Sequence, residues 1–344
     1  MPKKTAPKTT LQKVAKPPRL PKLLDRKIYK TGQTRGADDD VIFQNRVSRT
    51  STVLIPYTHW EQVSRPPEGE EIFENGFIAL ISPLKYFGTP GIEEELRSKG
   101  LEVGQNALVF YETRIEWNAN NPESVGWTEA QRRQAPLGGQ YIARIAATTA
   151  VENGLKIIRG FNTTDNKGAG IRLYEYASNK TISQCRLQLE ALFWLCRDAQ
   201  DVAVLNGMSK EETLERSVFI FQQSEQLSLL DMDRLREARV INSEGKTICP
   251  LCLKELSGQG FFTRLEQAEG REVHDLTVTQ LNLFHISELR FGLYNHRTYN
   301  LGWGHHHCNV VVKDDGIMGT LAWMHEVVER NISDGHFIPA KSPN

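Results

Sequence analysis

The chain has 344 residues, of which 39% are hydrophobic and 24% are charged, and its formal net charge at pH 7 is zero. This is the composition of a soluble globular protein long enough for one large domain or two ordinary ones. The longest apolar runs fall short of the roughly 18 residues that span a bilayer, the amino terminus lacks a secretory signal, and five cysteines fit a reduced compartment, so we expect a cytoplasmic protein with no membrane partner.

The amino-terminal segment 1–35 is rich in lysine and proline. Residues 1–30 contain ten lysines or arginines, five prolines and a single acid, Asp25, which leaves the rest of the chain net acidic by nine. This composition predicts an extended arm without helix or strand. The arm is either a solvated tail or a basic segment that binds a phosphate backbone with salt-dependent affinity.

A β-rich region follows, in which short apolar runs alternate with turn signals. Because neighbouring runs are separated by proline- and glycine-rich stretches, we expect them to form a mixed or antiparallel sheet. The predicted strands cover residues 51–55, 76–81, 106–111, 140–147 and 154–158.

Helical patterns dominate from about residue 180 onward. Residues 181–184 and 209–212 both have the form of a capping box, and apolar residues follow each of them at helical spacing. A third helix is predicted over 229–240. Core packing is expected for four aromatic residues of this region, Phe193, Trp194, Phe219 and Phe221.

The last hundred residues contain eight of the nine histidines and three of the five cysteines. Two pairs of soft ligands, 249–252 and 305–308, each have a two-residue gap, and 52 residues separate them. Such pairs are typical of a closed tetrahedral zinc site. The alternative interpretation of the same sequence is a set of buried free cysteines beside a run of surface histidines. Spacing favours His305 as the nitrogen ligand, with His306 next. We predict that structural Zn²⁺ is bound by Cys249, Cys252, His305 and Cys308.

A second pattern is interleaved with the first. Residues 281–286 alternate as a strand that carries His285 near its end, and the spacing of the later motifs suits a second strand and the start of a helix. The combination resembles the HNH nucleases, also called ββα-metal endonucleases, and extends over residues 249 to about 325. The motifs that carry the resemblance are Cys249-Pro-Leu-Cys252, Phe284-His285-Ile286, Asn300-Leu301, His305-His-His-Cys308-Asn309 and Lys313-Asp314-Asp315.

The resemblance implies a division of labour among these residues. His285 would be the general base that deprotonates the attacking water. Without the neighbouring motifs, a single histidine on an apolar strand would be interpreted as a core residue with its hydrogen bonds satisfied. Asn309 would bind a catalytic divalent cation, Mg²⁺, that stabilises charge on the phosphate and the leaving oxygen. Asn300 would orient the imidazole or hold the loop between the strands. Zinc would serve as scaffold only.

One position departs from the family pattern. HNH nucleases usually carry an acidic metal ligand immediately before the histidine, and here that residue is Phe284. The cation is then held by Asn309, phosphate and water, or another acid replaces the missing one, or the module is inactive. The nearby acids are Asp275, Glu288 and Asp314. Three further histidines of the segment, His296, His307 and His325, are interpreted as surface or supporting residues.

The rest of the chain requires a different role. We predict an α+β protein with a basic arm (1–35), a DNA-recognition and dimerisation region of mixed β-sheet and helices (36–240), and a small zinc-containing HNH nuclease module (241–344). By size and architecture such a chain resembles a type II restriction endonuclease of the prokaryotic cytoplasm, acting on double-stranded DNA as a homodimer.

Two other functions fit the same residues: a homing or modified-base-dependent HNH nuclease, and a non-enzymatic zinc-dependent DNA-binding protein. The polar stretches 46–49 and 131–134 are either base-reading segments or solvated patches that contact phosphate.

Overall fold

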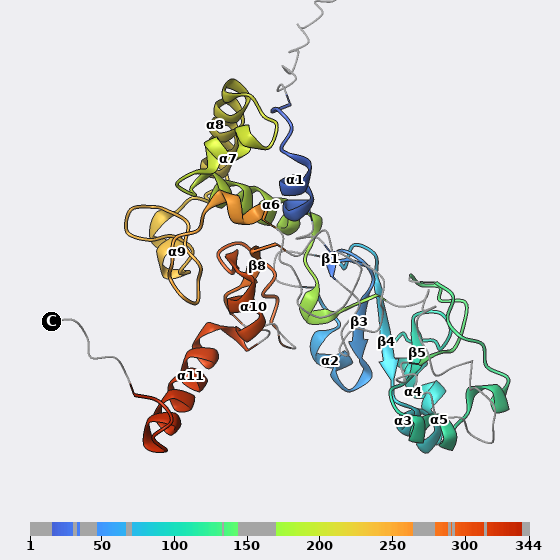
Figure 1. Ribbon diagram of the computed structural model, residues 1–344. Helices are drawn as coiled ribbons and strands as arrows, with labels where there is room; N and C mark the ends of the chain where they lie inside the picture. The colour runs from blue at the N-terminus through green and yellow to red at the C-terminus, as the bar shows by residue number, and fades with distance from the viewer. Residues whose placement is uncertain are drawn as a thin grey trace, which may run out of the picture.

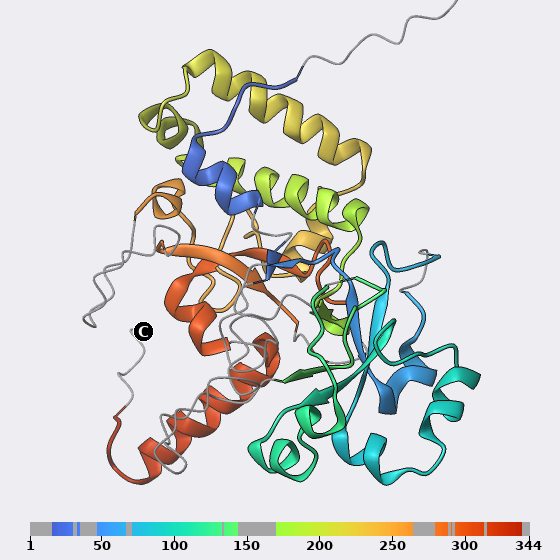
Figure 2. The ribbon, with the colours of Figure 1, turned by 90° about the vertical axis from the view of Figure 1, so that its right-hand side faces the viewer.

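The computed structural model (Figure 1) describes residues 16–29, 33–34, 47–66, 71–132, 134–143, 170–263, 279–287, 290, 293–312 and 315–338. A sheet with short helices lies on one side of the molecule, and a group of helices and a small hairpin lie on the other. Figure 2 shows the hairpin between the long helices and the last helix of the chain.

The sheet has five strands in the order β6-β5-β4-β3-β7, and every neighbouring pair is parallel. The expected mixed or antiparallel sheet is therefore wrong for the described strands. Four strands match the predicted ranges within two residues at their start, and the predicted strand at 154–158 lies outside the described residues. The strands are β3 (Val53–Pro56), β4 (Phe77–Ile81), β5 (Ala107–Tyr111), β6 (Tyr141–Ala143) and β7 (Ile171–Arg172).

Burial and connection length explain the parallel arrangement. All five residues of β5 are buried, and strands covered on both faces are apolar throughout instead of alternating, which is the usual pattern of parallel sheets. Parallel neighbours also need long crossovers, and here short helices fill them. These are η2 (Tyr57–His59), α2 (Trp60–Val63), α3 (Pro83–Gly88), α4 (Ile92–Ser98), α5 (Arg114–Ala119) and η3 (Pro122–Val125).

The predicted helical region is confirmed, with shifted ends. Helix α6 (Asn179–Trp194) begins two residues before the predicted capping box, because the side chain of Ser178 accepts a hydrogen bond from Thr181 N and caps it. The second capping box is confirmed at the start of α8 (Lys210–Gln226). The third helix is shorter than predicted. The other elements of this region are η5 (Leu173–Glu175), α7 (Ala199–Leu205), α9 (Met232–Glu237) and η6 (Gly258–Phe261).

Helix α6 lies at the centre of the main hydrophobic core. Phe193 is fully buried and Trp194 is 7% exposed, while Phe219 and Phe221 are partly buried against the same core. The carboxylate of Glu190 forms a buried ion pair with Arg216, with 2.6 Å between Oε1 and Nε. The aromatic residues predicted for the core are thus found in it or packed on it.

The basic segment is not extended throughout. Residues Lys22–Tyr29 form helix α1, which packs on α6, and Lys27 is buried and donates a hydrogen bond to the backbone oxygen of Leu281. The expectation of an arm without helix is therefore wrong for this stretch. Leu24 and Ile28 are buried one helical turn apart and form the apolar face of this helix. The lysines and prolines around them dominate the composition, so the sequence did not indicate a helix here.

Two antiparallel strands and two helices end the described chain. β8 (Leu281–His285) pairs with β9 (Leu301–His305), so that His285 lies opposite Leu301. α10 (His306–Val312) follows β9 directly, and α11 (Gly316–Ser333) comes next. A further two-stranded ladder joins β1 (Gln33–Thr34) to β2 (Val47–Ser48).

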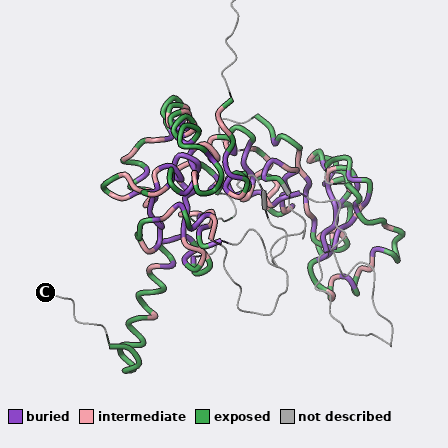
Figure 3. Tube along the Cα trace, turned by 45° about the horizontal axis from the view of Figure 1, so that its top comes forward, coloured by how far each residue is buried: buried purple, intermediate pink, exposed green. Residues whose placement is uncertain are grey.

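Helix α11 leaves the body of the molecule after its first turns, as Figure 2 shows. The tube in Figure 3 is exposed along most of the helix, including large apolar side chains such as Met318, Trp323 and Val328. None of the described helices is both long and apolar enough to cross a bilayer.

Candidate functional site

Four potential metal ligands come together at one end of the hairpin. The ligand atoms of Cys249, Cys252, His305 and Cys308 all lie within 4.8 Å of one another. The Sγ atom of Cys252 is 3.3 Å from Nδ1 of His305. Three cysteines and a histidine at this separation match the donor set and the size of a tetrahedral zinc site, in which the metal lies about 2.0–2.3 Å from each ligand atom. His305 is the member of the histidine run that joins the cluster.

The first cysteine pair is positioned by a tight backbone turn. Leu253 N donates to Cys249 O at 2.9 Å, and Leu253 adopts a left-handed conformation with φ of 58°, which lets the chain reverse within the pair. Backbone amides, including those of Cys252 and His305, donate toward the thiol of Cys249 and favour its thiolate.

Burial opposes ionisation at this cluster. It raises the pKa of the Cys249 thiol, and burial together with the two neighbouring thiols raises the pKa of Cys308 well above its usual range. Burial also lowers the pKa of His305 and keeps its ring neutral. A divalent cation would relieve the crowding of sulfur atoms and bind the neutral imidazole.

At the opposite end of the hairpin, His285 contacts a second histidine. Nε2 of His285 is 3.1 Å from Nδ1 of His296, and the two ring centroids are 5.4 Å apart. His296 is 1% exposed, so of its two interpretations the surface one is wrong, and the contact with His285 matches the supporting one. It lies in the loop between β8 and β9, and neither alternation nor helical periodicity marks a loop residue as buried.

The environment of His285 keeps its imidazole uncharged. Burial, reinforced by the positive charge of Arg49, lowers the pKa of His285 to about 3. Arg49 is itself buried and donates from Nη1 to the backbone oxygen of Glu175 at 3.2 Å. As a buried side chain Arg49 is neither an exposed base reader nor part of a solvated patch, so both expectations for the stretch 46–49 are wrong at this residue, and residue 46 lies outside the described residues. The ring is therefore neutral at neutral pH and its lone pair is available, but a pKa of about 3 also gives it a lower proton affinity than the near-neutral pKa that suits a general base best.

Phe284 belongs to the core. Its side chain is fully buried, and a Cβ added to Gly304 would lie 2.4 Å from the ring. Successive residues of a strand point to opposite faces of the sheet, so an acid at this position would lie on the face opposite to His285. At the position where HNH nucleases usually carry an acid, this chain therefore has a residue that packs in the core. The three acids considered as replacements lie outside the described residues.

Asn300 supports the loop between the two strands. Its Nδ2 donates to Asn295 O at 2.6 Å, and its Oδ1 accepts from Ser287 N at 2.8 Å. Of the two roles considered for Asn300, these contacts match the one that holds the loop.

Helix α10 carries the last predicted site residue, Asn309, which is partly buried. His306 N donates to Gln280 O at 2.8 Å, and Ile317 N donates to Ile286 O at 3.0 Å. The first contact lies at the start of α10 and the second in the first turn of α11, so the chain that joins them passes from one end of β8 to the other, and α10 contacts β8. Asn309 is the middle residue of α10.

The low pKa of His285 has a consequence for stability. An unfolded histidine titrates near 6.5 and the folded one near 3, so between these values the unfolded chain binds more protons. Stability is then fully present above pH 6.5 and falls as the pH is lowered toward 3. Urea unfolding at several pH values should show a shallower pH dependence for His285→Gln than for the wild type or for the exposed control His325→Gln. Equal slopes for all three proteins would contradict this prediction.

Comparison with known proteins identifies the family. The family model described as "BstXI restriction endonuclease" matches residues 26–306, well over half of the chain. No curated protein matches the sequence significantly. One solved structure, described as "Crystal structure of a type II restriction endonuclease", aligns with a TM-score of 0.28 and 15% identity over 46% of this chain. The chain spans 57% of the length of that relative, and the likeness is too slight to support an inference. From the family match, the chain belongs to the BstXI restriction endonuclease family.

Proposed function

We propose that this chain is a site-specific double-stranded DNA endonuclease of type II restriction kind, with His285 as general base. The observation that carries the proposal is the pairing of a neutral, partly buried His285 with His296 on a strand–strand–helix unit that also holds a Cys₃His cluster. Membership of a restriction endonuclease family supports a DNA substrate.

The chemistry that we propose starts from the histidine pair. If Nε2–H of His285 donates to Nδ1 of His296, then Nδ1 of His285 is the nitrogen that takes a proton from water. The deprotonated water would attack the phosphorus of the scissile phosphodiester, and the bond to the 3′ oxygen would break. Hydrogen bonding to a second ring fixes the tautomer that this step requires.

The proposal includes a catalytic Mg²⁺ that Asn309 would help to hold. When bound, such an ion supplies positive charge for the phosphate and the leaving oxygen. Among the described residues the structure gathers three or more histidine, cysteine or acidic ligands only at the Cys₃His cluster, so Asn309 would share the ion with phosphate and water. The Cys₃His cluster would hold Zn²⁺ as a scaffold.

We also propose that two copies of the chain act together on a two-fold symmetric site, because a symmetric dimer matches a symmetric duplex. The exposed apolar side chains of α11, among them Trp323 and Val328, form a surface that a second copy could bury. Such an enzyme would act in the prokaryotic cytoplasm.

Cleavage of plasmid DNA by the wild-type chain, with Mg²⁺ or with a chelator, tests the function. Discrete fragments that require the metal are expected. A smear would show a nuclease without site specificity and would overturn the restriction assignment. Retention of DNA without cutting in Mg²⁺ and in Mn²⁺ would favour the non-enzymatic DNA-binding alternative.

Deletion of residues 1–15 is expected to weaken DNA binding and to flatten its dependence on salt. This stretch contains four lysines and no acid, and each phosphate that the protein no longer neutralises reduces the slope of log K against log salt by about 0.9. Fluorescence anisotropy at several salt concentrations measures the slope. The deletion stops short of the α1 helix, so the melting temperature should remain unchanged. An unchanged slope would mean that these lysines do not contact phosphate.

A further inference from the structure

The loop that leads into β6, residues 127–140, reaches over the edge of the sheet where the parallel strands begin. Leu137 N donates to Gln105 O at 2.9 Å, which ties the loop to the segment before β5. A Cβ added to Gly139 would lie 2.2 Å from the backbone oxygen of Glu129, so the two arms of the loop are in direct backbone contact. The described residues on both sides of the tip are thus held by backbone contacts.

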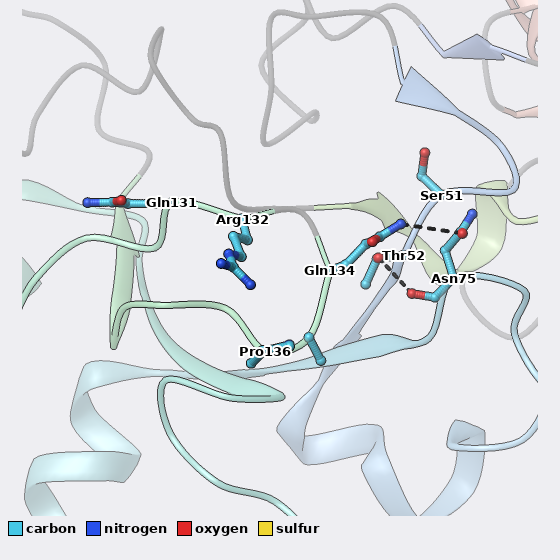
Figure 4. A pocket seen from close by; sticks show the side chains of 8 residues that line it. Ser51, Thr52, Asn75, Gln131, Arg132, Gln134 and Pro136 are labelled. Carbon is cyan, nitrogen blue, oxygen red and sulfur yellow. Dashed lines mark hydrogen bonds between the residues drawn. The ribbon is translucent and has the colours of Figure 1, made fainter.

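The tip borders a pocket of about 390 Å³, shown in Figure 4. Within the described part of the lining, the polar side chains carry hydroxyl, amide or guanidinium groups, and no lining residue is acidic. The polar lining residues include Ser51, Asn75, Gln131, Arg132 and Gln134.

Charge distinguishes this pocket from two other hollows in the same part of the molecule. One of them shares Pro136 with the pocket but also contains Glu102, and the other contains Glu93 and Glu102. Carboxylates repel a phosphate backbone, whereas the acid-free pocket with its guanidinium group suits a polyanion.

The polar side chains in the pocket divide into supporting and available groups. The amide of Asn75 donates to the backbone oxygen of Thr50 and accepts from Nε2 of Gln134 at 3.4 Å, so it holds the pocket together. Gln131 and Arg132 are exposed. In Figure 4, Arg132 lies between Gln131 and the Gln134–Asn75 pair.

The pocket is connected to the proposed active site through a short piece of chain. Ser51 and Thr52 line the pocket. Arg49 lies two residues before Ser51, and its charge acts on His285. Three residues span at most about 10 Å, so the near wall of the pocket lies within that distance of the Arg49 backbone.

We propose that Arg132 and Gln134 are base-reading residues that contact base edges of the DNA target in its major groove. Arginine forms a bidentate contact with guanine, and glutamine forms one with adenine. The proposal rests on the proposed function, because it assumes a specific duplex as substrate. Arg132 would supply the stronger contact, since Gln134 also bonds to Asn75.

Selection of bound duplexes from a random library tests this proposal without relying on cleavage. The cleavage-deficient His285→Ala chain serves as reference and is compared with the same chain carrying Arg132→Lys or Arg132→Ala. Lysine keeps the charge but loses the bidentate fork. Both variants are expected to lose preference at one base position of the site, with about tenfold weaker binding to the preferred base. Arg97→Ala, which changes an exposed arginine of the same region, should leave the selected sequence unchanged.

The outcomes separate the two proposals. If the reference chain selects a defined sequence and Arg132→Lys selects it equally well, base reading by Arg132 is wrong while the site-specific function stands. Uniform weakening of all sequences by Arg132→Ala would indicate a phosphate contact and would also overturn the reading role. If a reading variant relaxes one position but the wild type never cuts, the inference survives and the nuclease proposal fails. A reference chain that selects no sequence overturns both.

Discussion

Cys308→Ser is expected to release the bound metal and to unfold the carboxyl-terminal module. Cys308 is buried in the Cys₃His cluster and lies in the first turn of α10, directly after the hairpin. Structural zinc contributes about 10–16 kcal/mol in small zinc domains, whereas the whole free energy of unfolding of a domain is about 5–15 kcal/mol. If removal of one ligand releases the metal, the free energy lost is therefore as large as the whole free energy of unfolding of the module. Metal content per chain and the melting temperature measure the effect.

Cys185→Ala is the matched control for this prediction. Cys185 is equally buried, but it lies in α6 outside the cluster, and its replacement should cost only about 1 kcal/mol and leave the metal content intact. A Cys308→Ser protein that stays soluble and cuts DNA without bound zinc would show that the cluster is not a structural metal site.

The His285→Ala chain is expected to fold and to bind DNA but to cut it about 10²- to 10⁴-fold more slowly than the wild type. This is the usual contribution of a general base to a rate. Single-turnover cleavage of a fragment carrying one site measures the rate of the chemical step. Because burial keeps the pKa of His285 near 3, its protonation should not reduce the wild-type rate between pH 8 and pH 6.

His296 provides the comparison for this variant. As a positioning residue it should affect the maximal rate while the affinity for DNA stays unchanged, and His296→Gln, whose amide oxygen can still accept from His285, should recover part of the rate that His296→Ala loses. His325→Ala is the control, because the His325 side chain is exposed on α11. Wild-type rates for His285→Ala would remove His285 from the proposed mechanism.

The metal-ligand cluster was predictable from sequence because zinc chemistry restricts both residue type and spacing. Two pairs with two-residue gaps have few other uses, and the structure brings those four side chains together, including His305 from a run of three histidines. The strand–strand–helix order was predictable for a similar reason, since the alternation in 281–286 has a period that only a strand shares.

The parts that could not be predicted depend on tertiary contacts. Which strands lie next to one another is decided by the crossovers between them, whereas the parallel direction of β3, β4 and β5 was already indicated by runs that are apolar throughout instead of alternating. His296 lies in a loop and Arg49 just before a strand, so neither shows a periodic pattern that would reveal its burial. Helix α1 was concealed because lysine and proline dominate the composition around its two buried apolar residues.

The contact between α1 and β8 has a consequence for synthesis of the protein. Lys27 bonds to the backbone of Leu281 across 254 positions of sequence, so the buried partner of the β8–β9 hairpin belongs to the first part of the chain to leave the ribosome. During translation α1 has no β8 to contact for most of the time, because β8, β9 and Cys308 are synthesised late. Contacts of such high sequence separation form slowly. A nascent chain therefore stays without a finished hairpin until most of it has been made, which delays formation of the Cys₃His cluster and of the proposed active site.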